Sequence, residues 1–591
     1  MKQLYTCWAS QLNNEYFKEY PRPMLRRDSF INLNGLWEYA IQKEDSISSV
    51  TWQGTILVPF ALESALSKVQ RQLKPDEYLL YKKTFKNPLV ENSSILLHFD
   101  GVDYECKVYL NNQCIFEHKG GYIPFEMDIT SYLKEENELI VVVHDETDAS
   151  YHNRGKQTLV PKGMFYTSTS GIWKSVWMEV VPKEYIEDVS CQIDYDQKVV
   201  TISVNRKDEG FYTLEIYQPF IDTLTLAHSQ DCRDIQFDTD TKEYEKQSIL
   251  KSIQTDKDKV EIHFNTIQSW SPETPYLYYF KVHTKRDEVI SYFAFRTFTV
   301  EKENEHPRIC LNHKPIFQKG VLDQGYWPES GLTPPCDQAL LYDIIKMKEM
   351  GFNMIRKHIK VELPRFYYHC DRIGMMVWQD MVCGGSKYKL WFLAYVTTFF
   401  IQFHPPFSDR HSWLLGRQDE QGKKEFEQEM EETIAYLKGY PCISTWVLFN
   451  EGWGQFDTKR LTDKMRKLDS SRIIDATSGW YDQKVGDLRS HHHYYFRLNF
   501  IWEKERATVL SEFGGIPYIV KDHIPCENVY GYHEVNSIEQ LHDNYDKLIH
   551  SLDEAMKKGL SATVYTQVSD VEEEVNGILT YDREICKFEQ M

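Results

Sequence analysis

Eight short strand-like segments alternate with helix-like segments after residue 301, and this alternation limits the possible folds more than any other feature of the sequence. Between several of them lie amphipathic helices, predicted at 338–351, 425–440, 458–468 and 544–559. Repeated βα units predict a (β/α)8 TIM barrel over 301–591. Its strand candidates are 316–321, 352–358, 375–381, 443–450, 472–478, 488–495, 507–513 and 561–568.

The first 300 residues read as short alternating strands and predict two β-sandwiches. Ile95, Leu97 and Phe99 recur at period two in SILLHFDGVDYECKVYLNNQCIF, and the alternation resumes before the turn at Asn111-Asn112. We therefore predict a jelly-roll β-sandwich over 1–182. The strands between 183 and 300 are separated by polar turns and fit a smaller immunoglobulin-like β-sandwich.

A chain of 591 residues is too long for a single hydrophobic core, which agrees with three domains. The net charge of -20 argues against a nucleic-acid partner, because a phosphate backbone needs a basic surface. The amino terminus lacks the apolar stretch of a signal peptide, and no segment is as long as a membrane span. Twelve scattered cysteines favour mostly free thiols. We therefore expect a cytoplasmic protein with no membrane partner, and homo-oligomerisation stays open.

Two glutamates stand at the same position of two predicted barrel strands. Glu451 follows the apolar run WVLFN at the end of strand four, and Glu512 ends strand seven in TVLSEF. In a (β/α)8 barrel the carboxyl ends of the strands form the active-site mouth, so we expect the two side chains to face each other. Two opposed carboxylates suit retaining glycoside hydrolysis when they lie about 5 to 5.5 Å apart. The alternative is a pair of rim charges bound to arginine or lysine.

Motifs spread over nearly the whole chain support the first interpretation. They are PRPMLRRDSFINLNGLWEYAI, RGKQ, YTSTSGIWKSVWMEV, LNHKPIFQKGV, GFNMIRKHIKVE, WVLFNEGW and SEFGG. With them the chain resembles glycoside hydrolase family 2, which includes β-galactosidases, β-glucuronidases and β-mannosidases. The resemblance implies a sugar-binding-like jelly roll, a catalytic barrel, a carbohydrate substrate and no cofactor.

The resemblance also implies roles for individual residues. Glu451 would act as general acid and then as base, and Glu512 would be the nucleophile of a retaining exo-β-glycosidase. Asn450 would hydrogen-bond the 2-hydroxyl of the sugar, and Tyr494 would orient the nucleophile. The charge of Arg356 would keep the nucleophile ionised, although a structural ion pair between this arginine and a barrel acid fits the sequence equally well.

Further candidates for substrate contact lie where the sequence departs from the family pattern. KHIKVE replaces the Ser-His-Tyr-Pro of common β-galactosidases and β-glucuronidases, and WQDM is closer to the mannosidase version of strand three. The candidates are Lys357, His358, Asp380, Asp323 in the loop after strand one, and Trp453.

Three adjacent histidines, His491 to His493, resemble a metal site at first sight. Neighbouring residues of a strand point to opposite faces, so the three rings cannot converge on one ion. We predict that His493 touches the substrate beside Tyr494 and that the site holds no metal.

The choice of sugar depends on other loops. The Asn-x-Lys motif that binds the carboxylate of glucuronides is replaced by YTQVSDVEEEVNGILTYDRE, whose acids would repel a uronate. We therefore predict a β-galactosidase-like enzyme. The alternatives are a β-galactofuranoside, an α-L-arabinofuranoside or a β-mannoside as substrate, a less favoured β-glucuronide, and a catalytically inactive carbohydrate-binding protein. The aromatic insertion at 384–422 is either a subsite wall or a dimer contact.

Overall fold

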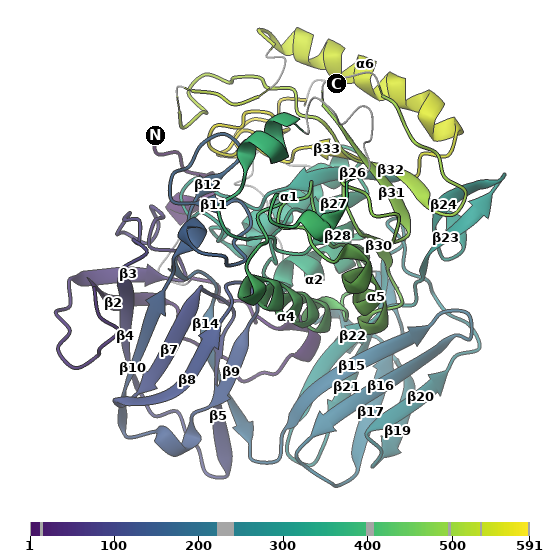
Figure 1. Cartoon of the computed structure of the whole chain (residues 1–591). Helices are drawn as coiled ribbons and strands as arrows, with labels where there is room; N and C mark the ends of the chain where they lie inside the picture. Colours follow the sequence, from purple (N-terminus) through teal and green to yellow (C-terminus); the bar gives the residue numbers. More distant parts are fainter. Residues whose placement is uncertain are drawn as a thin grey trace.

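The computed structural model describes residues 2–11, 16–221, 242–396, 407–494, 498–526, 528–531 and 535–588. Two β-sandwiches lie side by side beneath a strand-and-helix barrel (Figure 1). This arrangement confirms the predicted fold class of a jelly roll, an immunoglobulin-like sandwich and a TIM barrel. No helix in the described ranges is long and apolar enough to cross a membrane.

The barrel is one sheet of eight parallel strands, and all eight predicted strands are present. Its two end strands approach each other: the Asp487 N–H donates to the Ile474 carbonyl (2.8 Å), and the Ser490 hydroxyl donates to Asp475 (2.7 Å). The spatial order is β30 (Ile473–Asp475), β29 (Ile443–Val447), β28 (Met376–Asp380), β27 (Met354–Lys357), β26 (Gln318–Asp323), β33 (Ala562–Thr566), β32 (Ala507–Gly514) and β31 (Leu488–His493).

The α-helices of the described residues cover fewer strand connections than eight βα units require. They are α1 (Asp337–Glu349), α2 (Pro364–Ile373), α4 (Glu420–Leu437), α5 (Thr458–Leu468) and α6 (Ile538–Lys557). The connection from β30 to β31 has no helix, and neither do the described residues between β31 and β32 or those after β33. The prediction of eight complete βα units was therefore wrong in these three places.

Helix α2 was absent from the sequence-based prediction, and its shortness explains why: it has 10 residues, fewer than the window over which helical periodicity is recognised. Pro364 begins the helix with a φ already suited to it, and Gly374 ends it in the left-handed conformation at φ 76°. Every residue between them is buried, including Arg365 and His369, which both bind Asp337.

The N-terminal domain consists of two packed antiparallel sheets, as a jelly roll requires. One sheet has the order β3 (Gly54–Val58), β2 (Gly35–Gln42), β4 (Tyr78–Lys86), β10 (Glu136–His144), β7 (Glu105–Leu110) and β8 (Gln113–Lys119). The other has the order β1 (Ile31–Asn32), β14 (Val176–Pro182), β5 (Ser93–Phe99) and β9 (Phe125–Asp128). Short pairs join β11 (Gln157–Thr158) to β12 (Tyr166–Thr167) and β6 (Val102–Asp103) to β13 (Gly171–Ile172). Ile95, Leu97 and Phe99 all lie in the core between the sheets, as their period predicted.

The second sandwich is smaller. One sheet contains β15 (Ile186–Asp194), β16 (Val199–Arg206) and β20 (Lys259–His263). The other contains β18 (Phe220–Ile221), β21 (Tyr276–His283), β17 (Tyr212–Tyr217) and β19 (Ile249–Thr255), with β22 (Glu288–Phe293) also paired to β21. A three-stranded sheet of β23 (Phe298–Glu303), β24 (His306–Leu311) and β25 (Lys314–Pro315) leads into the barrel. The predicted boundary at 182/183 lies between β14 and β15, and the one at 300/301 lies within β23.

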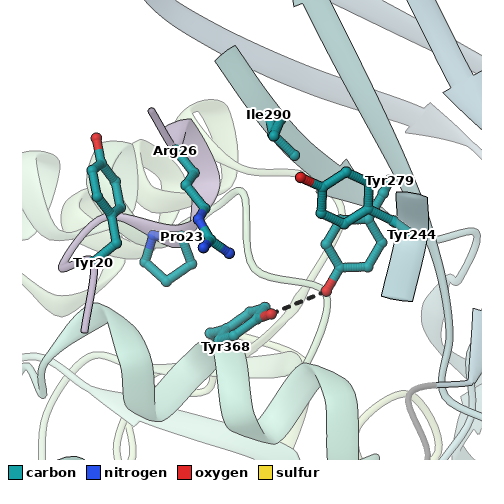
Figure 2. Close-up of a pocket in the computed structure, with 7 residues that line it drawn as sticks. All are labelled: Tyr20, Pro23, Arg26, Tyr244, Tyr279, Ile290 and Tyr368. Atoms are coloured by element: carbon teal, nitrogen blue, oxygen red, sulfur yellow. Dashed lines mark hydrogen bonds between the residues drawn. The ribbon is translucent and has the colours of Figure 1, made fainter. Parts of the chain in front are cut away.

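The three parts meet in a tyrosine-rich junction. Figure 2 shows a pocket whose lining comes from the N-terminal segment, the second sandwich and helix α2. The hydroxyls of Tyr279 and Tyr368 lie 3.2 Å apart and connect the second sandwich to the barrel. The remaining short helices of the described chain are η1 (Cys7–Gln11), η2 (Pro23–Leu25), η3 (Thr130–Tyr132), η4 (Thr147–Ala149), η6 (Glu243–Lys246), η7 (Trp391–Val396) and η9 (Asp409–His411).

Candidate active site

Glu451 and Glu512 lie together at the carboxyl ends of the barrel strands. Glu512 belongs to β32, and Glu451 follows β29 with a φ of 51°, a left-handed conformation that is uncommon outside glycine. The Glu451 N–H donates to the Ser478 carbonyl (3.0 Å), which holds this turn in place. One oxygen of each glutamate and one ring nitrogen of His492 all lie within 4.8 Å of one another. This spacing agrees with the separation of about 5 to 5.5 Å that retaining glycosidases need.

Glu512 is buried in a cationic environment. Arg356 Nη1 donates to its Oε1 (3.0 Å), and the hydroxyl of Tyr494 donates to its Oε2. Burial by itself would raise the pKa of Glu512, but the nearby His492 and the Arg356 guanidinium outweigh burial and lower the pKa. Burial and the adjacent carboxylate raise the pKa of Tyr494, so its hydroxyl keeps its proton. Glu512 is therefore a carboxylate at neutral pH.

Glu451 has a different environment. Its Oε1 lies 2.8 Å from His492 Nδ1, and its Oε2 accepts a long hydrogen bond from Trp453 Nε1 (3.4 Å). The side chain of Glu451 is 12% exposed, twice the 6% of Glu512. Glu451 thus contacts an imidazole and an indole, whereas Glu512 contacts the Arg356 guanidinium. The two carboxylates therefore lie in unequal surroundings.

Arg356 connects the residues that surround the nucleophile candidate. The guanidinium is fully buried and binds both oxygens of Asp380 at 2.9 Å, while its Nη2 also donates to Asn450 Oδ1 (2.9 Å). The oxygen of the Asn450 amide is thus directed toward Arg356. His358 Nδ1 lies 3.0 Å from Asp380, and burial lowers the pKa of His358. Arg356 thus contacts Glu512 and pairs with Asp380 at the same time, and its effect on a nucleophile stays a prediction.

We expect Arg356→Met to lower the free energy of unfolding by about 3–5 kcal/mol, because it leaves two buried carboxylates without their cation. The exposed Arg460, which pairs with Glu427 (2.8 Å), offers a matched control. Arg460→Met should cost less than about 1 kcal/mol. Chemical denaturation of both variants at neutral pH measures the difference, and equal costs would contradict the role given to Arg356.

His492 is the residue that the sequence-based prediction missed. Its ring is fully buried between Glu451 and Glu512, and in the ladder between β31 and β32 it pairs with Glu512. His493 directs its Nε2 to the Asn499 carbonyl (2.9 Å) and stacks beside His491, and its predicted substrate contact stays a prediction. Strand alternation could have selected His492, because residues two positions apart share a face and His492 lies two positions before Tyr494.

Lys357 and Asp323 are not brought together with the two glutamates. Lys357 Nζ binds Asp323 (2.5 Å) and Glu362 (3.0 Å) in a buried ion cluster that Lys360 completes. Neighbouring residues of β27 point to opposite faces of the strand. Because Arg356 points toward Glu512, Lys357 points away from it. Substrate contact by Lys357 and Asp323 stays a prediction.

An aromatic wall adjoins Glu451. Trp453 packs edge-on against Phe165 of the N-terminal domain (centroids 5.5 Å apart) and Tyr388 of the predicted insertion (4.8 Å). Arg154 lies over the Tyr388 ring at 5.0 Å and donates to the Gly385 carbonyl (2.6 Å). Tyr388 of the insertion therefore lies beside Glu451's neighbour Trp453. Residues 397–406 of the insertion lie outside the described ranges.

The acidic loop after β33 is fastened to the N-terminal domain. Glu572 accepts a hydrogen bond from the Thr167 N–H (2.9 Å), and Glu573 accepts one from the Gly163 N–H (2.8 Å). The hydroxyl of Tyr166 donates to Glu574. These three consecutive acids thus hold a jelly-roll loop against the barrel beside the aromatic wall.

Two clusters of the described residues have the spacing of metal ligands. The first is Glu451, His492 and Glu512 themselves, and the second is His523, Asp582 and Glu584. In the first cluster the ring nitrogen and both carboxylates already have protein partners. The expectation of a site without metal stays a prediction.

Comparison with known protein families identifies the family of this chain. Residues 70–182 match the family model for the sugar-binding domain of glycosyl hydrolases family 2, and residues 302–582 match the model for the TIM barrel domain of the same family. The chain belongs to glycoside hydrolase family 2. The resemblance drawn from the sequence motifs is thereby confirmed.

Curated members of glycoside hydrolase family 2 share about a quarter of their residues with the chain. A β-galactosidase of Thermoanaerobacter pseudethanolicus is 27% identical over 75% of the chain and 54% of its own length. A putative β-glucuronidase of Formosa agariphila is 25% identical over 74% of the chain and 50% of its own length. The chain thus spans about half the length of the curated relatives it matches.

Solved structures of the same family share the fold over almost the whole chain. A β-D-glucuronidase of Dictyoglomus thermophilum superposes with a TM-score of 0.69 at 18% identity, covering 95% of this chain and 96% of that one. A β-galacturonidase of Eisenbergiella tayi superposes with a TM-score of 0.65 at 17% identity, with 96% of both chains covered.

Proposed function

We propose that the protein is a retaining exo-β-glycosidase with a β-galactosidase-like preference, in which Glu451 is the acid/base and Glu512 the nucleophile. The observation that carries the proposal is the pair of carboxylates within 4.8 Å, of which only Glu512 contacts a permanent cation. A carbohydrate-binding protein has no need for two opposed acids in unequal surroundings.

In the first step an oxygen of Glu512 attacks the anomeric carbon and forms an ester bond to the sugar. The bond from the anomeric carbon to the leaving oxygen breaks, and that oxygen takes the proton of Glu451. Arg356 and the hydroxyl of Tyr494 hold the attacking carboxylate in position. The amide N–H2 of Asn450, whose oxygen is bound to Arg356, is available to donate to the 2-hydroxyl.

In the second step water enters from the side that the leaving group vacated. Glu451, now a carboxylate, accepts a proton from the water, and the hydroxyl oxygen bonds to the anomeric carbon. The ester bond breaks and Glu512 leaves as a carboxylate. Two displacements at one carbon return the original anomeric configuration.

The acidic loop supports a neutral sugar over a uronate. Glu572, Glu573 and Glu574 all lie in the loop that follows β33, and Asp570 of the same loop is bound to Lys587 (2.7 Å). Residues 568–582 of this loop contain acids but no lysine or arginine, so the loop supplies no cation that could bind a glucuronate carboxylate. The second candidate is a β-glucuronide, because relatives and solved structures named as β-glucuronidases share the family and the fold.

A panel of nitrophenyl glycosides tests the proposal. We expect the β-galactoside to have the highest kcat/KM, by about tenfold or more over the β-galactofuranoside, α-L-arabinofuranoside, β-mannoside and β-glucuronide. Proton NMR at early time should detect the β anomer of the released sugar first. Preference for the glucuronide would select the second candidate, and release of the α anomer first would exclude the retaining mechanism. Turnover of no glycoside would favour the carbohydrate-binding alternative.

A further inference from the structure

The ring of His492 occupies a position that the proposed mechanism does not yet use. It is fully buried, its Nδ1 lies 2.8 Å from Glu451 Oε1, and its Nε2 lies 3.0 Å from the Ser478 hydroxyl. The same Nε2 is 3.7 Å from Glu512 Oε1. One imidazole thus touches the acid/base directly and stands beside the nucleophile.

The position of Ser478 is fixed independently of its side chain. Its N–H donates to the Phe449 carbonyl (2.8 Å), and its own carbonyl accepts from the Glu451 N–H (3.0 Å). The backbone that carries Glu451 and the hydroxyl that meets His492 therefore form one unit. A hydroxyl that donates to Nε2 leaves the ring proton on Nδ1, where it points at Glu451.

We propose that His492 is a positioning residue that, backed by Ser478, donates a hydrogen bond to Glu451 and favours its carboxylate form during the second step of the proposed reaction. The inference rests on the proposed function. A hydrogen bond to a carboxylate is stronger than one to a carboxylic acid, so the contact tightens when Glu451 has given up its proton. Glu451 is then held as the base that accepts a proton from water.

Other charged groups surround this contact and would shape its pH dependence. Glu512 and Tyr494 face it from β32 and the end of β31, and Arg356 faces Glu512 from β27. Asp475 at the end of β30 interacts electrostatically with His492. The indole of Trp480 lies 6.2 Å from the His492 ring. His492 also lowers the pKa of Glu512, so its replacement acts on both glutamates. The nucleophile governs the acid limb of the pH profile and the acid/base the alkaline limb, so the two effects are read separately.

The decisive measurement is the pH profile of kcat/KM for His492→Phe, which keeps a ring and removes the donor. The alkaline limb of this profile follows the acid form of Glu451 in the free enzyme. Without the donor the carboxylate form is less favoured, so we expect the limb to move up by about one pH unit, the size of one charge-assisted hydrogen bond. Ser478→Ala should move it in the same direction by less, because the Nδ1 proton is then less firmly held.

His491→Phe is the matched control, because the neighbouring ring packs against Phe500 on the opposite face of β31. It should leave the alkaline limb unchanged, whatever its effect on stability. An unchanged limb in His492→Phe, or a limb that moves down, would overturn the inference, since a downward shift means that Nδ1 accepts from Glu451. If His492→Phe does not fold, Ser478→Ala decides alone by the same criterion.

The proposed function can fail separately. Wild-type protein that hydrolyses no activated nitrophenyl glycoside, or a Glu512 variant that retains wild-type turnover, would refute the glycosidase mechanism itself. Wild-type turnover that depends on Glu512, combined with an unmoved alkaline limb in the His492 variant, would refute only the role of His492.

Discussion

Glu512→Gly is expected to lower kcat for an aryl β-glycoside on the order of 10⁴-fold or more, because it removes the atom that forms the covalent intermediate. The space left by the side chain adjoins Arg356, whose charge would attract a small anion. Sodium azide should therefore restore turnover and give the α-glycosyl azide, since azide displaces the leaving group in a single inverting step.

Glu505→Gln supplies the control for this experiment. Glu505 lies in the loop that precedes β32. Its side chain is 80% exposed and pairs with Lys302 (2.8 Å). Its replacement should leave kcat unchanged. Wild-type-like hydrolysis by Glu512→Gly would show that the nucleophile is a different group.

Glu451→Ala is expected to lower kcat/KM by about 10² to 10⁴ for substrates with poor leaving groups, the range of general acid catalysis. A dinitrophenolate leaves without a proton, so the first step should remain fast with a dinitrophenyl glycoside and the glycosyl-enzyme should accumulate. The alkaline limb of the pH profile should disappear, because the group that it reports is absent.

Azide distinguishes the two glutamates by stereochemistry. In Glu451→Ala it should attack the glycosyl-enzyme from the face where water normally enters and give the β-glycosyl azide, the opposite anomer from Glu512→Gly. The anomer is read from the coupling of its anomeric proton in the NMR spectrum. An α-glycosyl azide from Glu451→Ala would contradict the assignment of Glu451 as the acid/base.

Most barrel strands could be predicted because they are short apolar runs, as expected for strands enclosed by helices on one side and core on the other. The exception is β31, whose sequence is LRSHHH. Helix α2 could not be predicted, because its 10 residues are too few for a helical period to be recognised. The absence of helices after β30, β31 and β33 had no sequence signal either, since irregular loops and weak helices share polar compositions.

The part of the candidate site that lies at the ends of the barrel strands could be predicted. Glu451 and Glu512 each end an apolar run, and the topology of the barrel brings those ends together. His492 was within reach of the same logic, because alternation from Tyr494 selects it over His493. The contacts of Phe165 and of the acids Glu572 to Glu574 could not be predicted, because they join distant segments of the chain. Gly163 and Glu573, for example, are 410 residues apart.

The fastening of the acidic loop to the jelly roll has a consequence for how such a chain can be rebuilt. Glu573 and Gly163 belong to different domains, and the wall beside Glu451 is completed by Phe165 from the same jelly-roll loop. In a chimaera of this barrel with the jelly roll of another family member, the acidic loop and the wall at Trp453 would face a jelly-roll loop of different sequence. A substitution on either side of this contact is therefore expected to require a compensating substitution on the other.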